Sequence, residues 1–360
     1  MTACPVKCNP QEFIQLAKKG DYQAAVKSIA DANPMGQACG LICPDKFCMK
    51  ACTRKNIDFP INIPKVQASI MNLHHNLSDK LPEARANGHK IAVIGAGPAG
   101  IAASSQLLKH GFNVVIFEAA NRVGGALNLI PSNRLPGEVI EKEWSFIKQN
   151  PLLQIRFNTK ITDFTRLFEQ GFEKIIVASG EPDSINLQVE GENLTTSYTD
   201  YLRSPEKYVT DGNVAVIGGG AVASDCALTA KNNGAQNVEM FIRRRVSDMR
   251  VTFEERRTLL ENDIDLTTMT KIKKIKTDNG LLTIHTCKNQ FVDGKLTEIE
   301  GTTIERPGFS LVIKAIGSSA PHFEDTDNII YAGDCKTGGS TIVEALASGK
   351  SAAEKIIQQK

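Results

Sequence analysis

The chain has 360 residues, of which 41% are hydrophobic and 23% are charged, a composition typical of a globular protein with two or three domains. Its 42 basic residues are nearly balanced by 40 acidic ones, which argues against a nucleic-acid-binding surface. The 9 cysteines are unevenly distributed, because six of them precede residue 53. This skew indicates that the N-terminal segment has a chemistry of its own.

The beginning of the chain, MTACPVKCNP, lacks the basic and apolar regions of a secretory signal. The longest apolar stretch, 91–103, is interrupted by three glycines and a proline, so no membrane-spanning helix is expected. We therefore predict a cytoplasmic protein. Thiols stay reduced in the cytoplasm, where clustered cysteines are typical of metal or redox sites rather than of disulfides.

Residues 1–85 are predicted to be helical, since apolar residues recur at helical spacing in 13–17 and 24–29. The early cysteines follow the pattern Cys4-x3-Cys8 and then Cys39-x3-Cys43-x4-Cys48-x3-Cys52. Thiolates at such close spacing suit soft metals and iron–sulfur clusters. The spacing matches neither common ferredoxin pattern, and a zinc site or inert helical thiols remain alternatives.

After a polar linker at 81–89, short β-branched strands alternate with helical stretches. The predicted strands are 90–94, 113–117, 174–178, 213–217, 238–242, 282–286, 311–315 and 329–332. Such alternation predicts βαβ units and parallel sheets. The expected fold class is therefore α/β, with two Rossmann-like dinucleotide-binding domains preceded by an all-α domain.

The first glycine-rich loop, GAGPAG at 95–100, follows a strand and opens a helix, and Glu118 ends the next strand. Gly95 permits the tight turn, Gly97 lets the backbone approach a pyrophosphate, and Gly100 allows close packing of helix and strand. The helix N-terminus faces the anion, and Glu118 can accept hydrogen bonds from a ribose. The context predicts a dinucleotide site rather than a packing turn.

The second loop, GGGAVA at 218–223, also follows a strand and fits G-x-G-x-x-A. The next strand ends in three arginines at 243–245, where an acidic residue would favour NAD. Guanidinium groups instead favour a 2′-phosphate, so we predict NADPH, with a solvated basic turn as the alternative.

Two such loops predict a bound flavin and a diffusing nicotinamide cofactor. The C-terminal segment supports the flavin, because Asp334 follows a strand and can bind a ribitol hydroxyl. A helix that begins near Thr341 can stabilise negative charge on a reduced flavin.

This tandem arrangement resembles the glutathione-reductase-like flavoprotein superfamily. Ala-Ser-Gly at 178–180 and Ala-Ile-Gly at 315–317 resemble its Ala-Thr-Gly crossover motifs, with the threonine replaced. The chain has no CxxC pair of the kind that several members place beside the flavin, and Cys226, Cys287 and Cys335 are expected to be packing residues. The predicted domains are 1–85 (iron–sulfur), 86–183 with 318–360 (FAD) and 184–317 (NADPH).

The run CGLICPDKFCMKACTRKNIDFPINIPKVQ, followed by a flavin domain, resembles the N-terminal half of dihydropyrimidine dehydrogenase, its bacterial NAD(P)H-dehydrogenase subunit and the glutamate synthase small subunit. In that group a helical domain holds two 4Fe-4S clusters. The resemblance implies that one cluster is bound by Cys8, Cys43, Cys48 and Gln67. Gln67 favours the pyrimidine branch, since the glutamate synthase group has Glu there.

For the second cluster, the resemblance supplies only Cys4 and Cys52, because the family's CxxC pair would lie upstream of this chain. This half-site is expected to be empty, completed by another chain or lost, unless the sequence is truncated. Cys39 matches a family cysteine that is not a ligand.

The resemblance and the motifs together define two sets of cofactor residues. For FAD they are Gly95, Gly97, Pro98, Ala99, Gly100, Glu118, Gly125, Arg134, Gly333, Asp334 and Thr341. For NADPH they are Gly218, Gly220, Ala221, Ala223, Arg243 and Arg244.

The resemblance implies an NADPH-oxidising electron-input subunit, in which hydride passes to FAD and electrons then pass through iron–sulfur to a partner. That partner would be a catalytic subunit carrying FMN, since three domains leave this chain no room for an FMN barrel. Neither nucleic acid nor a membrane is an expected partner. The alternatives are a glutamate synthase small-subunit-like protein, a free-standing NADPH diaphorase, and a docking module with a degenerate cluster domain.

Overall fold

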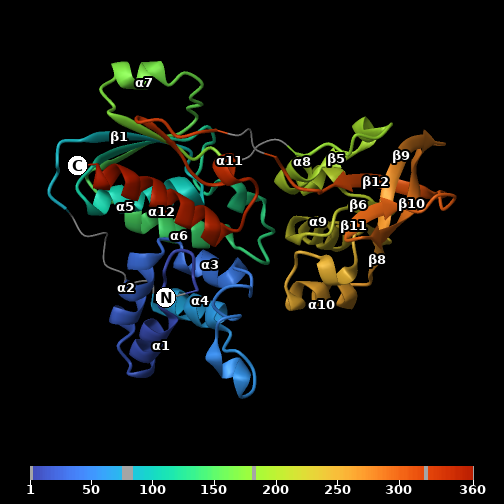
Figure 1. The fold of residues 1–360 in the computed structure, drawn as a ribbon, viewed down its shortest axis with the longest axis horizontal. Helices are drawn as coiled ribbons and strands as arrows, with labels where there is room; N and C mark the ends of the chain where they lie inside the picture. Colours follow the sequence, from blue (N-terminus) through green and yellow to red (C-terminus); the bar gives the residue numbers. More distant parts are fainter. Residues whose placement is uncertain (1–2, 75–83, 181–183, 320–322, 360) are drawn as a thin grey trace. The chain divides into compact units, whose positions relative to one another are not determined.

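A computed structural model of the chain describes residues 3–74, 84–180, 184–319 and 323–359 (Figure 1). The chain forms two compact units, each assembled from segments that are distant in sequence. The first unit comprises Met1–Asn128, Ser132–Glu181 and Ala320–Lys360, and the second comprises Leu129–Pro131 and Pro182–Ser319.

The first unit begins with a bundle of four helices. They are α1 (Pro10–Lys18), α2 (Tyr22–Ala32), α3 (Gly36–Ile42) and α4 (Ile63–His74), with a short 3-10 turn at Thr53–Asn56. Asn9 and Asp21 cap α1 and α2 by accepting backbone N–H bonds through their side chains, which explains where these helices start. Phe13, Val26 and Ile29 form part of the buried interior of the bundle.

The rest of the first unit is a parallel sheet with its helices. The strands are β1 (Lys90–Ile94), β2 (Asn113–Phe117), β3 (Leu153–Arg156), β4 (Lys174–Val177) and β13 (Ile329–Tyr331), in the order β13-β4-β1-β2-β3. Figure 1 shows α5 (Pro98–Lys109), α6 (Gly137–Lys148) and α12 (Ile342–Gln358) between this sheet and the helical bundle, with α7 (Thr165–Glu169) on the other side. The short α11 (Asp334–Thr337) follows β13.

Helices α5 and α12 come from opposite ends of the flavoprotein-like part and pack directly on each other. A Cβ atom added to Gly349 of α12 would lie only 1.9 Å from the carbonyl oxygen of Ala99 in α5. The glycine is therefore required for this close approach, which brings the C-terminal segment against the first glycine-rich loop.

The second unit is built on a mixed sheet in the order β11-β10-β12-β6-β7-β8. Its elements are β5 (Thr196–Ser197), α8 (Tyr198–Arg203), β6 (Asn213–Ile217), α9 (Ala221–Asn232), β7 (Val238–Ile242), α10 (Phe253–Glu261), β8 (Ile264–Thr268), β9 (Thr270–Asp278), β10 (Leu281–Val292), β11 (Lys295–Glu298) and β12 (Ile304–Lys314). The predicted strands β6, β7 and β12 run parallel, as expected, and β8 joins them in parallel beside β7.

The structure confirms the α/β class and the helical N-terminal segment, but the expectation of parallel sheets was incomplete. Strand β10 pairs antiparallel with β9, β11 and β12. Two tight turns make this possible, since Asn279-Gly280 and Asp293-Gly294 all have positive φ, which two-residue hairpins require. Strands β3, β5, β8, β9 and β11 were not predicted.

A buried ion pair stabilises the second unit. The Nζ atom of Lys314 lies 2.5 Å from Oε1 of Glu192, and both side chains are largely buried, at 9% and 18% exposed. Burial opposes ionisation of Glu192, but hydrogen bonds from Lys314 and two backbone N–H groups lower the pKa of this carboxyl overall.

Replacing Lys314 with methionine is expected to lower the free energy of unfolding by about 3 kcal/mol, because the Glu192 carboxylate would be left buried and unpaired. Urea denaturation measures the change. Lys273→Met is the matched control, since its ion pair with Glu298 is exposed and should contribute little to stability. Equal losses of unfolding free energy in the two variants would show that the buried ion pair stabilises the protein no more than the exposed one.

Candidate functional site

The first glycine-rich loop has the backbone geometry of a dinucleotide site. Gly95 has φ +102°, and a Cβ there would lie 2.3 Å from the carbonyl oxygen of Ala178. A Cβ on Gly100 would lie 1.9 Å from the carbonyl oxygen of Gly95. At Gly97, by contrast, the nearest atom is 3.9 Å away, so space remains open at the start of α5. Two glycines are thus required by packing, and the third leaves room for a phosphate.

Glu118 is held beside this loop by two backbone hydrogen bonds. Its Oε2 atom accepts the N–H of Ala96 at 2.7 Å, and its Oε1 atom accepts the N–H of Ala120 at 2.7 Å. Each oxygen keeps a free lone pair with which it can accept a ribose hydroxyl. The carboxylate therefore fits the role that the sequence predicts.

The C-terminal candidates lie next to the same loop. Gly333 has φ +72°, and a Cβ on it would lie 2.8 Å from Cβ of Ala99. Asp334 follows directly, and burial raises the pKa of its carboxyl, while Ser340 donates its hydroxyl hydrogen to Oδ1 at 2.5 Å. Thr341 caps α12 together with Glu344. The structure thus brings Asp334 and Thr341 to the glycine-rich loop.

The other predicted FAD residues surround the loop. Pro98 and Ala99 form the first turn of α5, and Gly125 approaches the Cα atom of Gly97. The N–H of Gly124 donates to the carbonyl oxygen of Ala96 at 2.9 Å, which fixes this second segment against the first. Arg134 lies three residues ahead of α6.

The second unit repeats this arrangement. Gly218 has φ +148°, and a Cβ there would lie 2.2 Å from the carbonyl oxygen of Ala315 and 3.0 Å from Cβ of Ala223. Around Gly220 no atom lies within 4 Å of the position that a Cβ would take. Helix α9 begins at Ala221, so its first turn opens onto free space. These residues fit a second dinucleotide pyrophosphate.

Arg243 and Arg244 lie exposed just after β7. Their carbonyl oxygens accept hydrogen bonds from Asn289 and Met269, which hold the backbone in place. Sequence reasoning missed Arg250, whose N–H donates to the carbonyl oxygen of Gly219 at 3.1 Å. The sequence signal that could have identified it is its position, a few residues after the three arginines at 243–245. Three arginines therefore surround the end of β7 and the second glycine-rich loop.

The four predicted ligands of the complete cluster come from three parts of the helical bundle. Cys8 precedes α1, Cys43 and Cys48 follow α3, and Gln67 lies in α4. The Sγ atom of Cys8 lies 3.7 Å from Oε1 of Gln67. The Nε2 atom of Gln67 donates to the carbonyl oxygen of Gly36 at 2.6 Å, which orients the amide with its oxygen toward Cys8.

The thiols of this group lie within electrostatic reach of one another. Burial, together with the neighbouring Cys4 and Cys48 thiols, raises the pKa of Cys8 and of Cys43 to about 12. Thiols with such a pKa stay protonated unless a metal displaces the proton, so a cationic cluster fits this donor set.

The two half-site residues behave differently. Cys4 raises the pKa of the Cys8, Cys43 and Cys48 thiols through charge repulsion. In Cys52, by contrast, a hydrogen bond with the backbone at Ile61 lowers the pKa. Cys39 is buried within α3. Within the described ranges, no three Cys, His, Asp or Glu side chains are grouped tightly enough to hold a single metal ion.

One ion pair joins the cysteine loop to the C-terminal helix. Nζ of Lys46, between Cys43 and Cys48, lies 3.3 Å from Oε1 of Glu344 in the first turn of α12. The Glu344 carboxylate is also close enough to contribute to the raised pKa of Cys43. The expected cluster ligands thus lie near the helix start that is expected to face the flavin.

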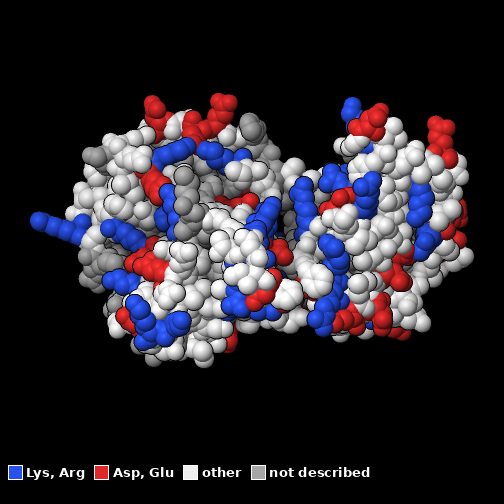
Figure 2. Space-filling model, turned by 60° about the horizontal axis from the view of Figure 1, so that its bottom comes forward, with Lys and Arg blue, Asp and Glu red and all other residues white. Residues whose placement is uncertain are grey.

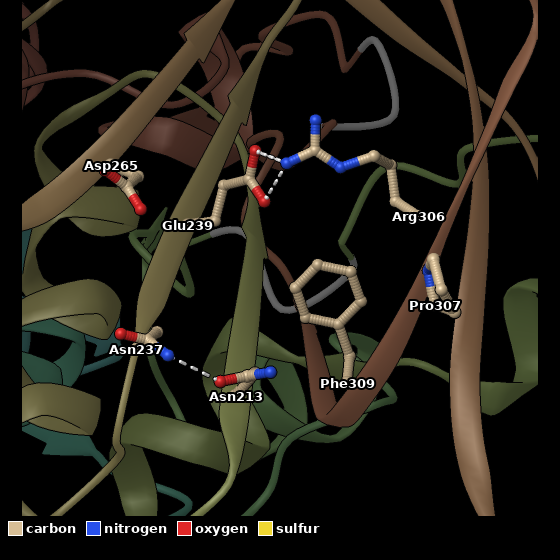
Figure 3. A pocket seen from close by; sticks show the side chains of 7 residues that line it. All are labelled: Asn213, Asn237, Glu239, Asp265, Arg306, Pro307 and Phe309. Carbon is tan, nitrogen blue, oxygen red and sulfur yellow. Dashed lines mark hydrogen bonds and ion pairs between the residues drawn. The ribbon is translucent and has the colours of Figure 1, made fainter.

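A cavity of about 250 Å³ in the second unit is a different feature (Figure 3). Its lining residues are Asn213, Asn237, Glu239, Asp265, Arg306, Pro307 and Phe309. Arg306 pairs with Glu239 at 2.6 Å, and Asn237 donates to Asn213 at 2.9 Å. These residues include the starts of β6, β7 and β8, whereas the glycine-rich loop follows the end of β6, so the cavity lies outside the nucleotide site.

Charged side chains of both signs are interspersed over each unit on the face drawn in Figure 2. Neither unit presents an all-basic surface on that face. Among the helices that the structure describes, none is long and apolar enough to cross a membrane.

Comparison with known proteins agrees with this arrangement. Residues 89–349 match the family model of pyridine nucleotide-disulphide oxidoreductases, and residues 1–78 match that of dihydropyrimidine dehydrogenase domain II, 4Fe-4S cluster. The NAD-dependent dihydropyrimidine dehydrogenase subunit PreT of Escherichia coli is 28% identical over 98% of this chain and 89% of its own length. The small chain of glutamate synthase [NADPH] from Bacillus subtilis is 26% identical over 99% and 85%.

Solved structures show the same fold. Mycobacterium tuberculosis FprA in complex with NADPH superposes with a TM-score of 0.66, at 17% identity, over 75% of this chain and 84% of its own. The thioredoxin reductase of T. acidophilum superposes with a TM-score of 0.54, at 18% identity, over 75% and 97%.

Proposed function

Because this chain belongs to the pyridine nucleotide-disulphide oxidoreductase family, we propose that it is the electron-input subunit of a larger enzyme of the dihydropyrimidine dehydrogenase type. The chain is an NAD(P)H-dependent FAD oxidoreductase. Bound FAD would take hydride from NADPH and release electrons one at a time, a conversion that belongs to the flavin itself. The electrons would then leave through a 4Fe-4S cluster to a partner.

We assign FAD to residues 86–183 with 318–360, and NADPH to residues 184–317. The division of the chain into two units, each with its own glycine-rich loop, supports this assignment. In the first, Gly97 and the start of α5 would hold the pyrophosphate, Glu118 a ribose, and Asp334 the ribitol chain. The start of α12 at Thr341 would face the flavin ring.

We assign NADPH rather than NADH on the arginines of this chain. The Escherichia coli relative is named NAD-dependent and the Bacillus subtilis relative is named for NADPH, so names alone do not choose. Arg243 and Arg244 are exposed at the position where an acid would bind the 2′-hydroxyl of NAD.

The observation that carries the electron path is the placement of the cysteine loop against α12. Residues 1–85 would hold one complete cluster, bound by Cys8, Cys43, Cys48 and Gln67. The Lys46–Glu344 ion pair lies between this loop and the helix that would face the flavin. Cys4 and Cys52 remain half of a second site.

The partner would be a catalytic subunit that carries FMN and receives electrons from the cluster. Two relatives are named as subunits, one of dihydropyrimidine dehydrogenase and one of glutamate synthase, which supports a partner in general. Gln67 at the ligand position favours the dihydropyrimidine dehydrogenase type over the glutamate synthase type.

Anaerobically purified protein is expected to contain one FAD and about four irons per chain, and NADPH should reduce the flavin first and the cluster next. Metal analysis and an NADPH titration followed by absorbance and electron paramagnetic resonance (EPR) measure this. In Cys43→Ser, iron should fall below about one per chain, because a hydroxyl is a poor ligand for iron–sulfur clusters.

Cys226→Ser is the matched control, since Cys226 is buried in the second unit and should leave the iron content unchanged. Wild-type protein without iron but with full NADPH-dye activity would favour the diaphorase. About eight irons per chain would overturn the single-cluster assignment.

A further inference from the structure

Glu143 is a buried carboxylate with an unusual pair of partners. It lies on α6 and is only 2% exposed, yet it reaches the first turn of α3 in the helical bundle. Its Oε1 atom accepts the N–H of Gln37 at 2.5 Å, and its Oε2 atom accepts the N–H of Ala38 at 3.2 Å. Across the part of the chain that the structure describes, no basic side chain forms an ion pair with it.

A carboxylate in this position is costly to bury. Burial raises the pKa of Glu143 to about 8, and the two backbone hydrogen bonds oppose that rise without cancelling it. An apolar residue at this point of α6 would pack without that cost, but it would leave both N–H groups of α3 unsatisfied. The two hydrogen bonds therefore connect the sheet part of the first unit specifically to the start of α3.

Helix α3 in turn controls two of the proposed cluster ligands. It ends at Ile42, so Cys43 is the next residue along the chain. The carbonyl oxygen of Gly36 in its first turn accepts the amide of Gln67 at 2.6 Å. A Cβ on Gly40 would lie 2.6 Å from the backbone nitrogen of Ala68, so α3 and α4 are in backbone contact. A shift of α3 would therefore move Cys43 and Gln67 together.

We propose that Glu143 is a positioning residue, which fixes α3, and with it Cys43 and Gln67, relative to the flavin-binding part. This inference rests on the proposed function, since it concerns electron transfer from the flavin to the cluster. Bound NADPH would supply two electrons and a proton, as hydride, to the flavin, and each electron leaving the flavin would reduce the cluster by one electron. The rate of that transfer falls steeply with the separation of the two centres, so a loosened α3 slows it.

Replacing Glu143 with glutamine keeps the shape of the side chain and removes one of its two acceptor oxygens. Its one carbonyl oxygen can accept only one of the two N–H groups, and its NH2 group would face the other donor. At pH 9, where a carboxyl with a pKa of about 8 is ionised and both its oxygens can accept, the ratio of the cluster-reduction rate to the flavin-reduction rate after mixing anaerobic Glu143→Gln holoprotein with NADPH is expected to fall at least ten-fold. The EPR spectrum of the reduced cluster should also change. Glu141→Gln, an exposed change on the same helix, should keep the ratio within two-fold.

A second pair of variants removes a donor instead of the acceptor. Gln37→Pro deletes the N–H that Oε1 accepts and places the proline Cδ atom against that oxygen, at a position in the first turn of α3. Gln37→Ala keeps that N–H and loses the side-chain bond to Asn72 together with the packing of a buried side chain. The rate ratio should fall about ten-fold in Gln37→Pro relative to Gln37→Ala, and adding Glu143→Gln to Gln37→Pro should lower it by less than two-fold more.

An unchanged ratio and spectrum in Glu143→Gln, or full additivity of the two substitutions, would overturn the role of Glu143. Failure of the proposed function looks different, because wild-type protein would then show no cluster signal at all. Thermal melting of each variant shows whether it folds. If Glu143→Gln does not fold, the comparison of Gln37→Pro with Gln37→Ala decides whether Glu143 has the proposed role.

Discussion

Replacing Gly97 with valine is expected to give a folded protein that has lost FAD, with affinity for the flavin at least 100-fold lower, or about 2.7 kcal/mol. The backbone of Gly97, at φ −78° and ψ −177°, suits any residue, and the nearest atom to an added Cβ is 3.9 Å away. The new side chain would occupy the space in front of α5 that the pyrophosphate needs. Flavin absorbance of the purified protein and its titration with FAD measure the loss.

Gly100→Val is the matched control for this prediction. Its Cβ would lie 1.9 Å from the carbonyl oxygen of Gly95, so α5 could not pack on β1 and the fold itself should be disrupted. The melting temperature should therefore fall strongly in Gly100→Val and stay near the wild-type value in Gly97→Val. Normal FAD content in Gly97→Val would show that the flavin pyrophosphate does not bind at this loop.

Replacing Arg243 and Arg244 together with alanine is expected to lower kcat/KM for NADPH about 100-fold and for NADH less than about three-fold. Each guanidinium would lose a charged hydrogen bond to the 2′-phosphate, worth about 1.5 kcal/mol or more. Both side chains are exposed, so the double variant should keep its melting temperature. Steady-state kinetics with both nucleotides measure the ratio.

Arg257→Ala controls for a general change of charge, because Arg257 is exposed on α10 and pairs with Glu261. It should alter neither nucleotide's kcat/KM by more than about two-fold. Equal losses of kcat/KM for NADPH and NADH in the arginine double variant would contradict 2′-phosphate recognition. The arginines would then be interpreted as a solvated basic turn.

The parts that could be predicted from sequence are those encoded locally. Each glycine-rich loop stands between a short apolar strand and a helix, and both loops have the predicted connection. Strands β9 and β11 were missed although Asn279-Gly280 and Asp293-Gly294 signalled their hairpins. Strand β3 was missed because only alternate residues of its four are partly buried.

The site residues that escaped prediction depend on long-range contacts. The meeting of Cys8 with Gln67 spans 59 residues, and here only family resemblance pointed to it. Glu143 was not singled out, because an acidic residue on an amphipathic helix is normally exposed. Its burial results from the approach of α3, more than 100 residues earlier in the chain.

The sheet of the first unit is completed by β13 and covered by α12, which lie at the far end of the chain from β1. During synthesis, residues 182–319 of the second unit are made before these elements. The second unit is therefore expected to complete its sheet first, while the edge of β4 and the face of α5 that Gly349 will cover remain exposed. The first unit, although its synthesis starts earlier, would mature last, and a late stop codon would disrupt the surroundings of the first glycine-rich loop and spare the second.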